Sequence, residues 1–210
     1  MISRRQMIAS SSALAALGVS SAARAQGATC AVFDKSSQAA TSPDQALARL
    51  KEGNERFSNG KTVNCDLMSQ VKATSGQQSP VACVVGCIDS RVPPELVFDQ
   101  RLGDIFAARV AGNFVNTDII GSLEFATKLA GAKVIVVLGH TECGAIKGAV
   151  DDAKLGNLTA TLANIRPSLT KLNYSAMPSS KNKELVQRVA DQNARDAAAN
   201  LTAKSEVLSE

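Results

Sequence analysis

The chain has 210 residues, enough for one ordinary domain once any leader is removed. Hydrophobic residues make up 45% and charged residues 20%, proportions typical of a soluble globular protein. The formal net charge is only +4, there is no Trp and there is one Tyr, so the composition argues against nucleic-acid binding through a basic stripe or aromatic stacking.

Residues 1–25 are predicted to be a targeting segment that is not part of the fold. Arg4 and Arg5 precede a nearly uncharged apolar run over 7–19, which is shorter than the about 20 residues that span a bilayer. The run is followed by Ala-Arg-Ala at 23–25, which suits a signal peptidase. The segment resembles a twin-arginine signal peptide, with an ordinary secretion signal as the alternative. We therefore expect a periplasmic protein with no stable membrane insertion after signal removal.

The next part of the chain marks the start of the folded domain. Residues 26–41 are rich in Ser and Ala and predict a flexible N-terminal arm, and a single domain is expected over 42–210. Ser42 followed by Pro43 is typical of a helix start, with a cap and then Pro at the first helical position. Gly60 is expected to end this first helix.

Short apolar runs farther along the chain predict buried strands. These runs cover residues 81–85, 105–110 and 134–138. The third run is continuous and β-branched, so we expect cover on both of its faces. Residues 116–130 have a helical apolar face, and a strand, a crossover helix and a second strand form the βαβ unit of a parallel sheet. The expected fold class is α/β, a single domain with a mainly parallel β-sheet core flanked by helices, with a last helix over about 182–202.

Reactive side chains directly follow two of these strands. Cys87, Asp89 and Arg91 come after the first strand, and His140 and Cys143 come after the third. Because the carboxyl ends of neighbouring parallel strands meet at one edge of a sheet, these groups are expected to converge in one cleft. Thiolate and imidazole suit Zn²⁺, so Cys87, His140 and Cys143 are candidate metal ligands. Asp89 is then either a fourth ligand or steps aside for water.

The amino-acid sequences of both clusters resemble motifs of a known family. Residues 87–95, Cys-Ile-Asp-Ser-Arg-Val-Pro-Pro-Glu, and 139–145, Gly-His-Thr-Glu-Cys-Gly-Ala, resemble the two signature motifs of β-class carbonic anhydrases. The resemblance covers about residues 43–205, and the two motifs occur in the family's order and spacing. Shorter segments that resemble the family lie at 53–57, 111–113 and 121–125.

The resemblance implies a function and a set of site residues. It implies reversible hydration of carbon dioxide to bicarbonate and a proton by a zinc-bound hydroxide, with one Zn²⁺ per chain bound by Cys87, His140 and Cys143. It implies that Asp89 is a switchable fourth ligand paired with Arg91 and that both are catalytic, whereas a plain surface ion pair is the alternative. It also implies a parallel core of about four strands and a homodimer or homotetramer.

The chain also departs from the family pattern. Members usually continue beyond the long last helix with a further strand, and no matching segment precedes Glu210. We expect such a chain to have an unpaired sheet edge. His140 is the single histidine, so no second imidazole is available to carry protons, and turnover is expected to depend on buffer concentration.

Other interpretations remain open at this point. A hydrolase of CS₂ or COS from the same family, or a non-catalytic zinc-binding bicarbonate sensor, would use the same ligands. A redox pair of Cys87 and Cys143 is a weaker alternative, because the two are far apart in sequence and form no Cys-x-x-Cys motif. A disulfide such as Cys30 to Cys65 is an open possibility, and Cys83 lies in an apolar run typical of a buried thiol.

Overall fold

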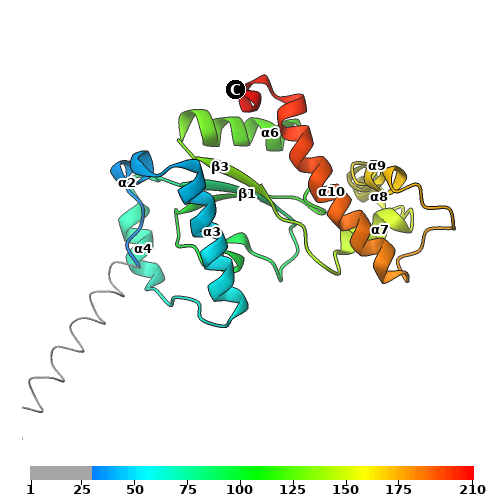
Figure 1. Cartoon of the computed structure of the whole chain (residues 1–210), viewed down its shortest axis with the longest axis horizontal. Helices are drawn as coiled ribbons and strands as arrows, with labels where there is room; N and C mark the ends of the chain where they lie inside the picture. The colour runs from blue at the N-terminus through cyan, green and yellow to red at the C-terminus, as the bar shows by residue number, and fades with distance from the viewer. Residues whose placement is uncertain (1–29) are drawn as a thin grey trace, which may run out of the picture.

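The computed structural model describes residues 30–210, and its centre is a sheet of three parallel strands (Figure 1). The strands are β1 (Ala82–Gly86), β2 (Ile105–Arg109) and β3 (Val134–Val137), in the spatial order β2-β1-β3. The register pairs Ala82 with Ile105 on one side and with Val134 on the other. The predicted α/β class with a parallel sheet is confirmed.

The sheet has three strands among the described residues, where about four were expected. After β3 the chain turns into a loop and then into helices, down to the short α11 (Glu206–Ser209), so no further extended segment reaches the sheet. β3 is consequently an edge strand. Both faces of β3 are covered as expected, because Ile135 and Val137 pack against one hydrophobic cluster and Val134 and Val136 against another. All four residues are only half-buried because one edge of the strand has no neighbouring strand among the described residues.

β1 owes its burial to layers on both faces of the sheet. Its side chains alternate, so Cys83 and Val85 pack into one hydrophobic cluster while Ala82 and Val84 pack into another. All five of its residues are buried. This buried central strand therefore provides a rigid support for the loop that begins at Cys87.

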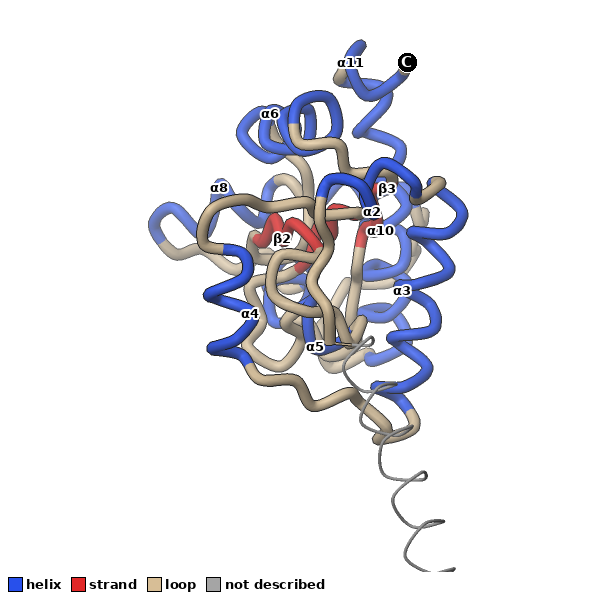
Figure 2. Tube along the Cα trace, turned by 90° about the vertical axis from the view of Figure 1, so that its left-hand side faces the viewer, coloured by secondary structure: helices blue, strands red, loops and turns tan. Residues whose placement is uncertain are grey.

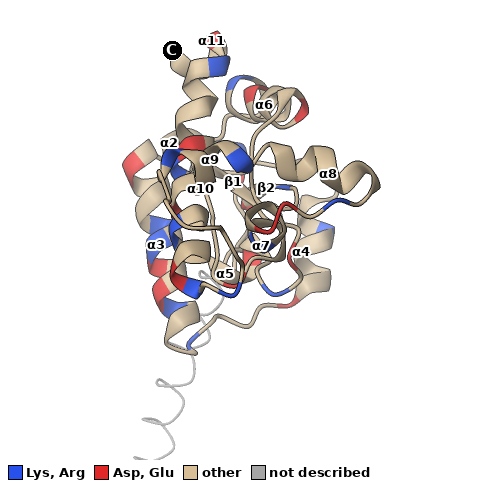
Figure 3. Ribbon diagram, turned by 90° about the vertical axis from the view of Figure 1, so that its right-hand side faces the viewer, with Lys and Arg blue, Asp and Glu red and all other residues tan. Residues whose placement is uncertain are grey.

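The first face is covered by α3 (Pro43–Ser58) and α5 (Pro94–Val97). α3 begins with a capping box, in which the Ser42 hydroxyl accepts from the Gln45 amide and the Gln45 side chain accepts from the Ser42 amide. Leu50 of α3 is buried against the strands. Acidic and basic positions intermingle along the rest of α3 (Figure 3).

The second face is covered by α6 (Thr117–Glu124) and the later part of α10 (Lys183–Lys204). The helix predicted over 116–130 is present, but its second half is the π-helix η1 (Phe125–Leu129). Gly131 ends it with a φ of 83°, a left-handed conformation that glycine adopts without strain.

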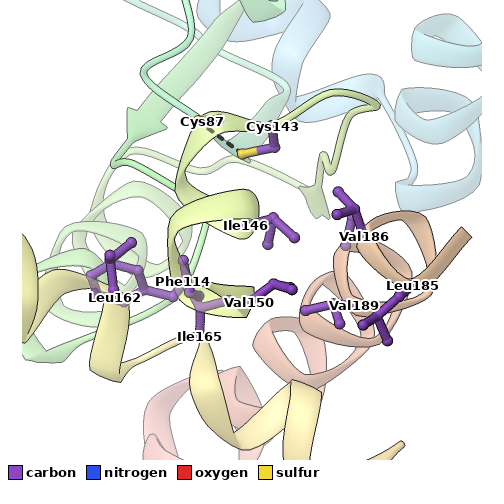
Figure 4. Packing of buried hydrophobic residues seen from close by; sticks show 12 residues of the cluster. Cys87, Phe114, Cys143, Ile146, Val150, Leu162, Ile165, Leu185, Val186 and Val189 are labelled. Atoms are coloured by element: carbon purple, nitrogen blue, oxygen red, sulfur yellow. Dashed lines mark hydrogen bonds between the residues drawn. The ribbon is translucent and has the colours of Figure 1, made fainter. Parts of the chain in front are cut away.

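A third hydrophobic cluster lies beyond the carboxyl ends of the strands (Figure 4). It is built by α7 (Gly144–Val150), the first half of α10 and two short helices, and it includes the side chains of Cys87 and Cys143. The two short helices are α8 (Gly156–Ala163) and α9 (Arg166–Lys171). The cysteines of both motifs thus sit at the border between this cluster and the sheet.

The N-terminal residues of the described part differ from the expected flexible arm. Residues 35–40 form α2 (Lys35–Ala40), and Cys30 is joined to Cys65 by a disulfide. The buried Gln38 side chain donates to the carbonyls of Pro80 at 2.6 Å and Ala130 at 2.8 Å. These are long-range contacts, which local composition does not reveal.

The predicted signal peptide, residues 1–25, lies outside the described residues. Over residues 30–210, no helix has both the length and the apolar character needed to cross a membrane. The helix α4 (Leu67–Thr74) follows Cys65 of the disulfide, and its N-cap is Asp66, whose carboxylate accepts from the amides of Met68 and Ser69.

Candidate metal centre

Three predicted ligands come together at the carboxyl ends of β1 and β3. Cys87 follows β1, His140 and Cys143 follow β3, and these two strands are neighbours in the sheet. Their candidate ligand atoms all lie within 4.8 Å of one another, and the two sulfurs are 3.9 Å apart. Both cysteines are buried and His140 is half-buried. The sheet therefore places two thiols and one imidazole around a single point.

The imidazole of His140 is oriented as a metal ligand. Its Nδ1 lies 2.9 Å from the carbonyl oxygen of Thr141. A carbonyl can only accept, so Nδ1 carries the proton and Nε2 presents a lone pair. Nε2 is buried and has no hydrogen-bond partner among residues 30–210. A cation held between Nε2 and the two sulfurs would satisfy this buried acceptor. The residues present therefore fit a metal ion.

The donor set suits zinc. Two cysteine sulfurs and one histidine nitrogen are borderline-soft ligands that favour Zn²⁺ over Mg²⁺ or Ca²⁺. Three protein ligands leave one position of a tetrahedron for water, which is the pattern of catalytic rather than structural zinc sites. Cys87, His140 and Cys143 thus have the right chemistry to hold the ion that the sequence predicts.

The two thiols are not equivalent. The Cys143 thiol and the Gly112 amide, whose nitrogen is 3.3 Å from the sulfur, both donate to Cys87 and lower its pKa. The same interaction with Cys87, together with burial, raises the pKa of Cys143. Cys87 is therefore the more acidic thiol of the pair, and a bound cation would stabilise both thiolates.

Asp89 lies beside the cluster and is bound by Arg91. The Arg91 side chain donates from Nε to Oδ1 at 2.8 Å and from Nη2 to Oδ2 at 2.7 Å, and the Arg91 amide donates to Oδ1 at 3.0 Å. These bonds hold the pKa of Asp89 well below its usual range. The Asp89 carboxylate is not among the atoms that gather around the metal point. Its role as a fourth ligand therefore stays a prediction.

Arg91 also connects the two motif loops. Its Nη2 donates to the carbonyl oxygen of Glu142 at 3.2 Å. Glu142 has a φ of 57°, a left-handed conformation that is unfavourable for a residue with a Cβ atom. The arginine thus ties the Asp89 loop to the turn that carries His140 and Cys143.

Two further side chains that support the site were not found from the sequence. Arg109, the last residue of β2, donates to the carbonyls of Cys87 at 2.8 Å and Asp89 at 2.7 Å. The amide of Asn193, on α10, donates to the carbonyl of Gly112 at 2.7 Å. A charged residue at the end of an apolar strand is a signal that could have identified Arg109, whereas nothing local distinguishes Asn193.

A cleft of about 340 Å³ opens beside His140. One wall is the loop of residues 139–141, and the other is α10, which contributes Gln187, Asp191 and Arg195. Their spacing of four residues places these polar side chains on one face of the helix. The sequence shows that spacing, but it does not show which face of α10 turns toward the site.

Comparison with known sequences identifies the family. The carbonic anhydrase family model matches residues 82–210. Carbonic anhydrase 2 of Mycobacterium tuberculosis is 36% identical over 151 residues, which cover 71% of this chain and 64% of that protein. A carbonic anhydrase of Mycolicibacterium smegmatis is 38% identical over 135 residues, covering 61% and 66%. The chain thus spans just under two thirds of the length of these relatives.

Solved structures agree with the sequence matches. The β-carbonic anhydrase CafA of Aspergillus fumigatus has a TM-score of 0.55 and 27% identity, over 76% of this chain and 74% of that chain. A β-carbonic anhydrase of Coccomyxa shares the fold with a TM-score of 0.61 at 24% identity, over 78% and 74%. From its motifs, its fold and these matches, the chain belongs to the β-class carbonic anhydrase family.

Proposed function

We propose that this chain catalyses the reversible hydration of carbon dioxide to bicarbonate and a proton, with one zinc ion per chain. The observation that carries the proposal is the cluster of Cys87, His140 and Cys143 with the Asp89–Arg91 pair beside it. A purely structural zinc site has no use for a carboxylate held next to the ligands. This arrangement therefore favours catalysis over a non-catalytic sensor.

The residues of the chain have separate tasks in this reaction. When bound, zinc acts as a Lewis acid that lowers the pKa of water from 15.7 to about 7. Asp89 orients the water. Its carboxylate has about four lone-pair sites, and Arg91 occupies three of them through Nε, Nη2 and its amide. One site on Oδ2 remains to accept a hydrogen bond from the attacking water.

The proton produced by the reaction needs a route to solvent. His140 is the single histidine of the chain, and it is committed to the cluster. The proton is therefore transferred through water, carboxylates or buffer. We expect the turnover to rise with buffer concentration at fixed pH and ionic strength, and a flat rate would contradict this route.

The first experiment is stopped-flow CO₂ hydration by the purified protein, zinc-loaded and zinc-stripped, with the zinc content measured in each sample. Fast hydration that is lost on stripping and restored by zinc is the expected result. Protein that holds stoichiometric zinc and shows no hydration would overturn the proposal.

The role of Asp89 is tested by Asp89→Asn. An amide keeps the shape but cannot take the place of the ionised acceptor, so we expect kcat/KM to fall by about 10²-fold or more with zinc still bound. The matched control is Asp44→Asn, in the exposed first turn of α3. Activity of the Asp89→Asn variant close to wild type would assign Asp89 and Arg91 to a surface ion pair.

We further propose that the protein is exported to the periplasm by the twin-arginine route. The proposal rests on the sequence of residues 1–25, and the Cys30–Cys65 disulfide supports an oxidising compartment. A folded reporter fused to residues 1–25 is expected to reach the periplasm, and changing Arg4 and Arg5 to lysine should block it. Export of unfolded reporter alone would favour the ordinary secretion route.

We also propose that the chain forms a homodimer or homotetramer. Two large apolar side chains are exposed. Ile88, beside the metal centre, is 61% exposed, and Leu129, at the end of η1, is 79% exposed. Ile88 directly follows a metal ligand, so a second chain placed there would help to close the site. Light scattering of the zinc-loaded protein gives the mass, and a monomer at micromolar concentration would contradict the proposal.

A further inference from the structure

A second pocket, separate from the metal centre, lies between α3, α4 and α5. Figure 2 shows α3 and α4 on opposite sides, with α5 between them. The pocket has a volume of about 580 Å³, within the range of small-molecule sites. Its lining includes none of the candidate metal ligands and neither Asp89 nor Arg91.

The polar feature of this pocket is Arg101. Its side chain is only 9% exposed, and its buried Nε has no hydrogen-bond partner among residues 30–210. Oδ2 of Asp104 lies 3.6 Å from that nitrogen, which is beyond hydrogen-bond distance. The guanidinium thus has one long ion pair with Asp104 and no side-chain hydrogen bond among the described residues, and a bound anion would supply the missing acceptors.

Arg101 shares its nearest carboxylate, Asp104, with Arg49. Oδ2 of Asp104 already accepts from Nη2 of Arg49 at 2.6 Å, and Asp99 accepts from Nε of Arg56 at 2.5 Å and from the Val63 amide at 3.1 Å. Asp99 is thus used by other donors, whereas Asp104 is shared between Arg49 and Arg101 and its Oδ1 has no hydrogen-bond partner among the described residues. Burial, followed by the charge of Arg49, lowers the pKa of Arg101, which is the direction expected for a cation without a dedicated partner.

The remaining lining is largely apolar. Phe57, Leu67 and Leu96 border the pocket and are 42%, 67% and 63% exposed, and a group of exposed apolar side chains around one pocket is typical of a binding site. Val63 adds to this wall. Glu95 also lines the pocket and forms no ion pair with Arg101 among the described residues. The ligand that fits has one anionic group for Arg101 and an apolar body for the wall.

We propose that this pocket binds a small organic carboxylate with an aromatic or branched aliphatic body, with the carboxylate paired to Arg101 and the body against Phe57, Leu67 and Leu96. A planar carboxylate matches the two parallel N–H donors of a guanidinium, which favours it over a simple halide. This site is independent of the proposed hydration of CO₂.

The experiment uses 4-fluorobenzoate as the probe, titrated into the zinc-loaded full chain by calorimetry under non-reducing conditions. We expect saturable binding that weakens about ten-fold or more in Arg101→Met, with unchanged zinc content and CO₂ hydration. Equal affinity of the variant would overturn the proposal, because it would assign the binding to the metal centre. No saturable binding by the wild-type protein would overturn it as well.

Two control ligands test separately how the negative charge and the apolar part of the probe contribute to binding. Neutral 4-fluorobenzamide tests the charge and should bind at least about ten-fold more weakly. Acetate tests the apolar body and should also bind more weakly. If either control binds as tightly as the probe, an amphiphilic carboxylate site is excluded.

Variants at and near the pocket test where the probe binds while Arg101 stays in place. Leu67→Asp adds a negative charge at the pocket and should weaken binding, whereas Met68→Asp changes a neighbour that is 73% exposed but does not line the pocket. Glu95→Gln removes a repelling carboxylate and should tighten binding. Equal effects of Leu67→Asp and Met68→Asp would contradict the assigned pocket.

Discussion

Arg109 shows how a single side chain outside both motifs fixes the shape of the metal centre. Its guanidinium donates to the carbonyls of Cys87 and Asp89, the two residues that flank Ile88. The turn that carries the thiol and the carboxylate is thereby fastened to β2, although both belong to the strand end of β1. Outer partners of this kind orient ligands without touching the metal.

We predict that Arg109→Met weakens zinc binding by about 10- to 100-fold, because the two carbonyls lose their donors and the Cys87 loop loses its fixed geometry. Competition with a chromophoric chelator measures the affinity. Arg188→Met, on the exposed side of α10, is the control and should leave it unchanged. An Arg109 variant with wild-type affinity would show that α7 and the sheet position the ligands without this side chain.

Cys83 offers a pH test of burial at the level of one residue. It is fully buried in β1, and burial raises its pKa from 9.0 to about 12. The fold therefore favours the neutral thiol. This stabilisation is fully present below pH 9 and is lost as the pH rises toward 12, because the unfolded chain loses the proton first.

From pH 8 to pH 10, we predict that the wild-type free energy of unfolding falls by about 1.4 kcal/mol more than that of Cys83→Val. Urea denaturation of both proteins at the two pH values gives the difference. Val has a similar size and no ionisable group, so other titrating residues cancel in the comparison. Parallel pH profiles of the two proteins would mean that the thiol titrates equally in both states.

At the scale of elements, the contact between α3 and α5 depends on a glycine. A Cβ atom at Gly53 would overlap the carbonyl oxygen of Phe98, which is backbone and has no side-chain freedom to move away. Gly121, in α6, has open space around the same position. The two glycines therefore differ in what a methyl group would meet, although both lie inside helices.

We predict opposite effects of alanine at these two sites. Gly53→Ala should destabilise the fold by about 1–3 kcal/mol through overpacking, whereas Gly121→Ala should stabilise it by about 0.5–1 kcal/mol through helix propensity. Urea midpoints with equal m-values measure both changes. A stable Gly53→Ala protein would indicate that α5 moves freely relative to α3.

The elements that were predicted from the sequence are those with strong local signals. Each of the three apolar runs forms a strand, and Ser42-Pro43 starts α3 as its capping chemistry indicates. An unpaired sheet edge was expected, but the sequence did not show that β3 forms one, because the order β2-β1-β3 depends on long-range pairing. The helix at Lys35–Ala40 was missed for a similar reason, since the Gln38 hydrogen bonds reach residues far along the chain.

The same contrast between local sequence signals and long-range contacts applies to the residues of the metal centre. Cys87, His140 and Cys143 directly follow predicted strands, so their convergence could be inferred from the rule for parallel sheets. Arg109 and Asn193 act on this site through backbone carbonyls. Such contacts need only a donor at the right place in space, so they leave no pattern of spacing, and the only local signal is the charge of Arg109 at the end of an apolar strand.

At the scale of the whole molecule, the Cys30–Cys65 disulfide closes a loop of 35 residues that contains α2 and α3. Cross-linking removes conformations from the unfolded chain, and a loop of this length corresponds to roughly 4 kcal/mol at 25 °C in the chain-entropy model. The bridge also holds the N-terminal segment near the residues that Gln38 contacts. Its loss should therefore affect the stability of the entire domain.

We predict that the double variant Cys30→Ser/Cys65→Ser loses about 2–4 kcal/mol of unfolding free energy, measured by urea denaturation with zinc bound. A phosphine reductant should bring the wild-type protein to the same value and leave the variant unchanged. That second measurement separates the bridge from the metal centre, because a reductant that acts on zinc would destabilise both proteins equally. If both shift together, the wild-type loss reflects the metal, whereas a shift in the wild-type protein alone establishes that the disulfide supports the fold.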